Sequence, residues 1–266
     1  MLEDIAIYIV IGIIAGLLAG TLGIGSGVFI VPALAFVFAR EHFPPSLIMH
    51  MAAGTSLMCI AVTTVRALMS HLKRNVAFWS VYKRLYPSII VGTISGAILS
   101  HYLHSRTLSI IFGIIVFLLG IKMFFPLPKS ESRHLPGTLG CSTAGFLIGA
   151  KSGLLGLGGG ALSTPFLTHY GVSLRQSVVV ATAVSVTVST VGAISFMLTG
   201  IDAQSVLAWT TGYVYWPAWF GVIVGSLTFV PLGVKLSHRL PTDILKRIFA
   251  VFLCVVGVHM LYVVWI

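Results

Sequence analysis

The sequence predicts an all-α polytopic membrane protein built of two inverted-topology repeats, each with about five helical segments. Three observations lead to this prediction: the composition, the recurrence of long apolar segments, and a similarity between the two halves. Hydrophobic residues make up 57% of the 266 residues and charged residues only 8%, whereas soluble domains carry roughly a quarter charged residues. The composition therefore excludes a single soluble domain.

Long apolar segments recur along the whole chain. A membrane span needs about 20 mostly apolar residues, and clear candidates lie at 47–70, 83–102, 107–126, 174–199, 205–233 and 243–265. Two further segments, 4–39 and 138–170, are too long for one straight helix at about 1.5 Å per residue. Both contain clustered glycines, so each is predicted to form a hairpin of two helices that opens its repeat.

The two glycine-rich stretches are copies of one motif. "GTLGIGSGVFIVPAL" (20–34) and "GLLGLGGGALSTPFL" (153–167) align at an offset of 133, and residues 20–27 and 153–160 are hereafter the first and second glycine breaks. "GTISG" (92–96) likewise matches "GVIVG" (221–225), both with the G-x-x-x-G spacing of close helix contacts. The repeat predicts three parts: an N-terminal repeat (1–125), a polar linker (126–137) and a C-terminal repeat (138–266).

The distribution of basic residues predicts the topology. If each glycine break returns the chain to its starting side, each half crosses the membrane an odd number of times. Arg40 and Arg106 then face one side, and most other basic residues face the cytoplasm, as the positive-inside rule favours. These residues are Lys73, Arg74, Lys83, Arg84, Lys122, Lys129, Arg133, Arg175, Lys235, Arg239, Lys246 and Arg247. We therefore expect a multi-pass protein of the bacterial inner membrane with both termini outside the cytoplasm.

The glycine breaks are the first candidates for a binding site. Unwound backbone at membrane depth is tolerated where protein or a water-filled cavity satisfies it, and broken helices in inverted repeats form substrate sites. The helix N-termini that follow the breaks favour an anion. Lys151 and Arg66 fall within or near the membrane, whereas all six acidic residues fall at predicted helix ends or in loops. Charge in the membrane is costly and usually functional, so an anion is the expected cargo.

Hydroxyl side chains near the breaks complete the candidate site. Ser26 is expected to cap the helix after the first break, and the other hydroxyls to bind an oxyanion. Two alternatives remain open: such hydroxyls can bond their own helix backbone, and the glycines can serve turning and packing alone. The predicted substrate-binding residues are Gly23, Gly25, Ser26, Gly27, Thr55, Ser56, Arg66, Lys151, Gly156, Gly158, Gly159, Gly160, Ser163 and Ser185.

Other classes of site find little support in the sequence. The three cysteines show no metal-ligand spacing, and no Cys, His and carboxylate constellation falls within the membrane, so no metal, cofactor or enzymatic activity is expected. The net charge of +10 is explained by cytoplasmic loops rather than by nucleic-acid binding. The expected partners are a small anion and the lipid bilayer, and the G-x-x-x-G faces would permit a homodimer.

The twin motifs, the stretch "AAGTSL" (52–57) and the two-half layout resemble the TauE/SafE sulfite-exporter family over essentially the full chain. The resemblance implies an inner-membrane carrier for small sulfur-containing anions such as sulfite, sulfoacetate or related sulfonates. Members of the family differ in cargo and direction, and we expect an exporter. A passive anion channel of the same architecture is the main alternative. A membrane scaffold or enzyme is the third.

Overall fold

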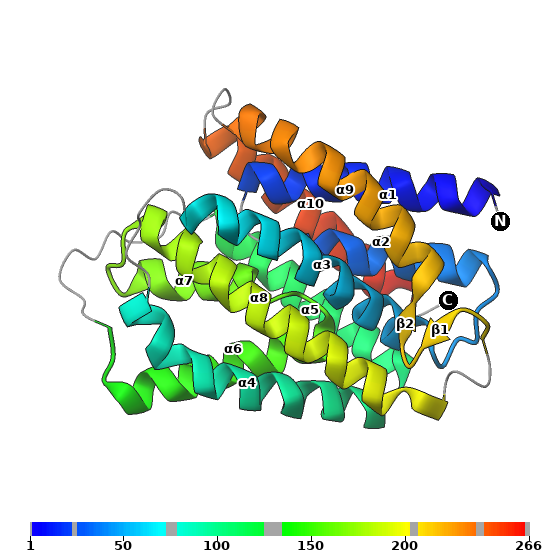
Figure 1. Cartoon of the computed structure of the whole chain (residues 1–266), viewed down its shortest axis with the longest axis horizontal. Coiled ribbons are helices and arrows are strands. Elements are labelled where there is room, and N and C mark those ends of the chain that lie inside the picture. The colour runs from blue at the N-terminus through cyan, green and yellow to red at the C-terminus, as the bar shows by residue number, and fades with distance from the viewer. Residues whose placement is uncertain are drawn as a thin grey trace.

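A computed structural model describes residues 2–22, 26–72, 79–124, 135–202, 207–237 and 242–263. Within these ranges the chain forms ten helices and one two-stranded hairpin, arranged as a bundle in which both termini lie at the same end (Figure 1). The helices are α1 (Leu2–Leu22), α2 (Gly27–Arg40), α3 (Ile48–Leu72), α4 (Trp79–Tyr102), α5 (Ser105–Phe124), α6 (Thr138–Leu155), α7 (Gly160–His169), α8 (Leu174–Thr199), α9 (Trp216–Ser237) and α10 (Thr242–Val263). The hairpin pairs β1 (Thr210–Thr211) with β2 (Val214–Tyr215).

The all-α class and the broken segments are confirmed. Each glycine-rich segment forms two helices, α1 with α2 and α6 with α7. The predicted span 205–233 is wrong at its start, because α9 begins only at Trp216 and the antiparallel hairpin precedes it. Gly212, with φ 56°, makes the tight turn of that hairpin, a backbone conformation that glycine adopts at little cost.

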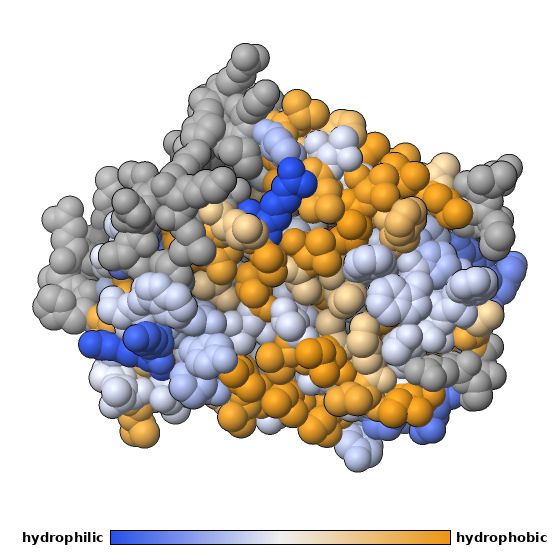
Figure 2. All heavy atoms as spheres, in the orientation of Figure 1, coloured by the Kyte–Doolittle hydropathy of each residue, from blue (hydrophilic) through white to orange (hydrophobic). Residues whose placement is uncertain are grey.

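The helices are apolar enough for a multi-pass membrane protein. By length and composition, four helices of the described chain can cross a membrane: α3, α5, α8 and α9. The apolar windows of α3 and α8 are 72% buried, against 33% in α5 and 39% in α9. The α3–α8 pair is therefore the centre of the bundle. Apolar residues cover much of the visible surface between its two ends (Figure 2).

The main contacts between helices are the same when the two halves are exchanged. Helix α1 packs along α9 as α6 packs along α4, and α2 packs on α3 as α7 packs on α8. Helices α5 and α10 pack against each other, as do α3 and α8. The two halves therefore build one bundle by equivalent contacts.

Glycines bring the paired helices into backbone contact. On α4, Gly92 and Gly96 face the carbonyl oxygens of Phe146 and Ala150 on α6. On α9, Gly225 faces the backbone of α1 at Ile9. Both predicted G-x-x-x-G faces are thus used within the chain, and a homodimer would need another surface.

Replacing Gly16 by Ala tests this close packing. The added Cβ would lie 2.7 Å from the carbonyl oxygen of Ser226 on α9, so we expect a loss of about 1–3 kcal/mol in stability from overpacking. Thermal unfolding of the purified protein in detergent measures the effect. The control is Gly137→Ala, where a Cβ meets no atom within 4 Å. Equal melting temperatures for the two variants would contradict the proposed role of Gly16.

Candidate functional site

The second glycine break is a tight turn that only glycines form readily. Helix α6 ends at Leu155, and Gly156, Gly158 and Gly159 follow with φ of 75°, 73° and 81°. The N–H groups of Gly156 and Leu157 both donate to the carbonyl of Ser152, at 3.0 and 3.1 Å. This left-handed ending is a common way to stop a helix. It turns the chain directly into α7.

The turn leaves a row of backbone donors at the N-terminus of α7. The N–H groups of Leu162 and Ser163 donate to the carbonyl of Gly159. For the four preceding N–H groups, of residues 158–161, no residue that the structure describes serves as acceptor. All four residues are buried, and buried N–H groups without an acceptor are rare in proteins. Four such donors at the positive end of a helix can together bind an anion.

The two glycine breaks meet in the middle of the bundle. A Cβ added at Gly27 would lie 2.6 Å from the carbonyl oxygen of Gly156, so the start of α2 touches the second break directly. The hydroxyl of Ser56 on α3 donates to the same carbonyl at 3.1 Å. Ser56 therefore satisfies a backbone acceptor that the turn leaves outside regular helix bonding.

Helices α3 and α8 form the walls around the second break. A Cβ at Gly158 would lie 2.9 Å from the side chain of Ile60 on α3. On the other side, one at Gly159 would lie 2.9 Å from Val188 on α8. The walls are thus aliphatic, and the polar groups at the centre belong mainly to the backbone.

The predicted hydroxyls have several different partners. Ser163 donates to the carbonyl of Gly159 at 2.9 Å, and Ser185 donates to that of Ala181 at 2.9 Å, so both bond their own segment. Thr55 accepts the N–H of Tyr215 at 3.0 Å and holds the hairpin. All three side chains are buried. The protons of Ser163 and Ser185 are thus used, and only their oxygen lone pairs remain for further bonds, whereas Thr55 uses a lone pair and keeps its proton.

The predicted cap by Ser26 is wrong. Ser26 does precede the first residue of α2, and its carbonyl accepts the N–H groups of Phe29 and Ile30. Its side chain, however, makes no capping hydrogen bond. The cause is its backbone, with φ −76° and ψ −10°, because a capping serine ordinarily has the extended conformation.

The structure brings some predicted residues together and leaves others apart. Gly27, Ser56 and the second break are in contact. Arg66 on α3 and Lys151 on α6 are exposed, and Lys151 follows the exposed Leu147 by four residues on the same helix face. Gly23 and Gly25 lie outside the described residues.

A polar cluster near the hairpin was missed by the sequence analysis. His101 Nδ1 lies 3.0 Å from the hydroxyl of Tyr213, and the ring of His50 lies 5.1 Å from the Tyr213 ring. Within the described chain, His50 Nδ1 and Ser100 Oγ are buried without a hydrogen-bond partner. Burial, with a further contribution from Asp202, raises the pKa of Tyr213, so its phenol stays protonated at neutral pH. No local signal places Tyr213 here, because the hairpin lies within a segment predicted as helix.

Comparisons with known proteins agree over the full chain. Residues 8–260 match the family model described as sulfite exporter TauE/SafE. A probable membrane transporter protein of Haemophilus influenzae is 31% identical, covering 98% of this chain and 99% of the relative. Similar proteins from Methanocaldococcus jannaschii and Bacillus subtilis (YunE), also described as probable membrane transporter proteins, are each 25% identical. They cover 96% of this chain and 94% and 97% of their own lengths.

Replacing Ser56 by Ala tests the contact between α3 and the second break. Loss of the bond to the Gly156 carbonyl is expected to cost about 1 kcal/mol and to speed hydrogen exchange of the backbone amides at 156–163. The control, Ser226→Ala, removes a similar buried bond, from Ser226 to the Gly12 carbonyl at 3.0 Å. Hydrogen–deuterium exchange mass spectrometry reads both variants. If Ser226→Ala alters hydrogen exchange at 156–163 as much as Ser56→Ala does, the effect does not come from the hydrogen bond between Ser56 and Gly156.

Proposed function

This chain belongs to the sulfite exporter TauE/SafE family of membrane transporters, and we propose that it exports a small sulfur-containing anion. Sulfite, sulfoacetate and related sulfonates are the expected substrates. The observation that carries the proposal is the row of buried backbone N–H groups at residues 158–161, without an acceptor in the described chain. An oxyanion offers several acceptor oxygens to such a row.

The chemistry of the break suits reversible binding. Its donors are backbone dipoles held by glycine geometry, and its walls at Ile60 and Val188 are aliphatic. A buried cation bound directly to the anion would hold it strongly through a charge-assisted pair, whereas neutral donors permit release. Lys151 is five residues before Gly156 on α6, about 7.5 Å along the helix axis. We propose that it attracts the anion through its field rather than through a buried ion pair.

We propose that transport proceeds by alternating access of two inverted repeats, residues 1–125 and 138–266, joined by the linker 126–137. Support comes from the main helix contacts, which are unchanged when the halves are exchanged, and from the two termini at one end of the bundle. In such transporters one repeat rocks against the other around a site near the membrane midplane. The charge distribution supports an inner-membrane protein with both termini outside the cytoplasm.

A passive anion channel is the second candidate. The observation that favours it is the position of the acidic residues: Glu131 lies outside the described residues, and the other five lie at helix ends or between helices. Without a carboxylate inside the membrane, the sequence offers no ligand of the usual kind for a coupling Na⁺ or proton. Reconstituted vesicles separate the two mechanisms, since a carrier shows saturable flux and counterflow and a channel shows neither.

Replacing Gly158 by Ala tests the binding role of the second break. The left-handed backbone and the nearby Ile60 oppose any Cβ at this position, so the donor row must shift. We expect at least a tenfold loss of affinity for sulfite or sulfoacetate, measured by calorimetry on purified protein. Gly171→Ala is the control, because Gly171 also has positive φ (76°) but lies in the exposed turn after α7. Unchanged affinity in Gly158→Ala would overturn the proposed site.

The contribution of Lys151 is tested by its replacement with Ala. A charge acting through its field should change affinity by a few-fold, and the change should shrink as salt is raised, because ions screen exposed charges. Calorimetry at low and high salt measures this. The control is Arg106→Ala, which removes an exposed cation from the start of α5. Affinity that is unchanged at low salt in Lys151→Ala would exclude the lysine from the site.

Cysteine labelling tests the topology. Thr138 and His104 are both exposed and lie at the starts of α6 and α5. In a background without the native cysteines, an impermeant maleimide added to intact cells should label His104→Cys and leave Thr138→Cys unlabelled. Permeabilised cells, in which both should react, are the control. Labelling of Thr138→Cys from outside would contradict the proposed orientation.

A further inference from the structure

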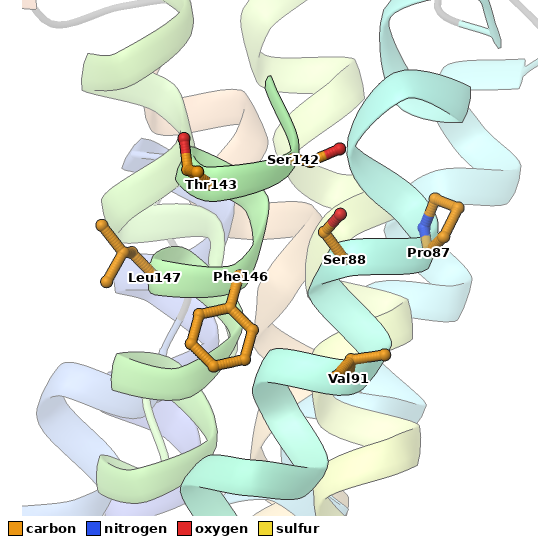
Figure 3. A pocket seen from close by; sticks show the side chains of 7 residues that line it. All are labelled: Pro87, Ser88, Val91, Ser142, Thr143, Phe146 and Leu147. Atoms are coloured by element: carbon orange, nitrogen blue, oxygen red, sulfur yellow. The ribbon is translucent and has the colours of Figure 1, made fainter. Parts of the chain in front are cut away.

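An open groove of about 560 Å³ lies between α4 and α6 on the outside of the bundle. Figure 3 shows Ser88 of α4 and Ser142 of α6 on the facing sides of the two helices, with Val91 and Phe146 further along. The groove is therefore polar toward one end and apolar toward the other. Leu147 extends the apolar side.

The apolar part of the groove faces outward. Val91 is 57% exposed and Leu147 is 53% exposed, which in a membrane-spanning bundle is expected of side chains in contact with lipid acyl chains. An acyl chain can lie along such a surface without displacing protein atoms.

The polar part of the groove carries two uncommitted hydroxyls. Most helical Ser and Thr side chains here donate to a carbonyl of the preceding turn, as Thr143 does to Gly140 at 3.1 Å. For Ser88 and Ser142, the described residues provide no such partner. Both hydroxyls are thus free to donate to a ligand in the groove.

Cations lie beyond the hydroxyls, toward the start of α4. Lys83 and Arg84 are exposed and precede Pro87 and Ser88 by four residues, so they lie one turn before two residues that line the groove. The Lys83 ammonium lies 6.0 Å from the centroid of the Trp79 ring. The positive charge of Arg84 acts on Cys141 of α6 by a coulombic interaction, so Arg84 lies on the side of α4 near α6. Neither α4 nor α6 contains an acidic residue that would neutralise these charges.

Two further features put this end of the groove at the membrane surface. Trp79, Tyr82 and Tyr86 form a series of ring contacts on the first turns of α4, with centroids 5.8 and 5.3 Å apart, and such aromatic residues favour the headgroup region. Helices α4 and α6 also run parallel, because Gly145 faces Leu85 and Gly153 faces Thr93. Their positive N-terminal ends therefore lie together at the cationic end.

We propose that this groove binds an anionic phospholipid of the cytoplasmic leaflet. Its phosphate lies at Lys83, Arg84 and the two hydroxyls, and one acyl chain follows Val91, Phe146 and Leu147. Basic pockets between transmembrane helices on the cytoplasmic side are suited to anionic headgroups.

The other half of the molecule offers an internal comparison. Helices α1 and α9 pack as α6 and α4 do, yet their equivalent positions differ in chemistry. At the offset of 133, Ile9 on α1 stands in place of Ser142. At the offset of 129, Lys83 and Arg84 correspond to Gly212 and Tyr213, which lie in the hairpin before α9. The hydroxyl and both cations thus occur only on the α4–α6 side. The fold alone does not require them.

Native mass spectrometry of the purified full chain tests the proposal. The probes are phosphatidylglycerol and phosphatidylcholine with identical acyl chains, each titrated into delipidated protein. We expect the wild-type protein to retain phosphatidylglycerol preferentially. Arg84→Ala should bind it about tenfold more weakly because one charge-assisted bond is lost, and a tenfold loss corresponds to about 1.4 kcal/mol. Arg106→Ala, an exposed arginine at the start of α5, is the control and should bind as the wild type does.

A second variant keeps the test independent of charge. Ser142→Leu fills the polar part of the groove and should weaken phosphatidylglycerol binding while the protein stays folded, as judged by size-exclusion chromatography. Equal retention of the two lipids by wild type, or equal losses in Arg84→Ala and Arg106→Ala, would overturn the proposal. A lipid-free dimer that Ser142→Leu dissociates would also overturn it and assign the groove to a second copy of the chain.

Discussion

A membrane interior supplies no water to backbone N–H and C=O groups, and this constraint governs the centre of the molecule. Every interruption of a helix there must find its own hydrogen-bond partners. At the second break, Ser152 accepts two N–H groups and Ser56 donates to the carbonyl of Gly156. These two carbonyls of the broken turn thus have donors, while the N–H groups of residues 158–161 have no acceptor in the described chain. Donors left over at a helix N-terminus are suited to an anion.

The same constraint explains why glycine has two separate roles in the chain. Glycines such as Gly16 and Gly153 lie inside regular helices and let two backbones touch, as at Ser226 and Thr93. Gly156, Gly158 and Gly159 instead supply left-handed backbone angles at a turn. The first group fixes α1 on α9 and α6 on α4. The α4–α6 pair fixes the end of α6, and the start of α7 is fixed by its packing on α8, so the turn between α6 and α7 is held from both sides.

Much of the fold followed from hydropathy and the internal repeat, because both are encoded in local patterns. The start of α9 could not be predicted in this way. Tyr213 and its neighbours are apolar enough to be part of a membrane-spanning helix, and only Gly212 indicates a turn. The exposure of Lys151 could have been predicted from the sequence. Gly145, Gly149 and Gly153 mark the face of α6 that meets α4, and Lys151 lies roughly opposite Gly149 at 100° per residue. The hydrogen-bond partners of Ser163 and Ser185 could not be predicted from the sequence, because a hydroxyl in a helix can bond its own backbone or a ligand equally well.

The two halves share their packing but not their charges, and this difference separates what the fold needs from what is added to it. Helix contacts that survive exchange of the halves belong to the common architecture. Lys151 has Leu18 as its counterpart at the offset of 133, and Lys83 and Arg84 have Gly212 and Tyr213 at the offset of 129. All three cations thus belong to the α4–α6 pair, and the α1–α9 pair has none at the equivalent positions. Two similar halves in opposite orientations would present the same surface to both sides of a membrane. Charges confined to one helix pair remove that equivalence, so they can distinguish the two sides of a membrane without altering the packing that both halves share.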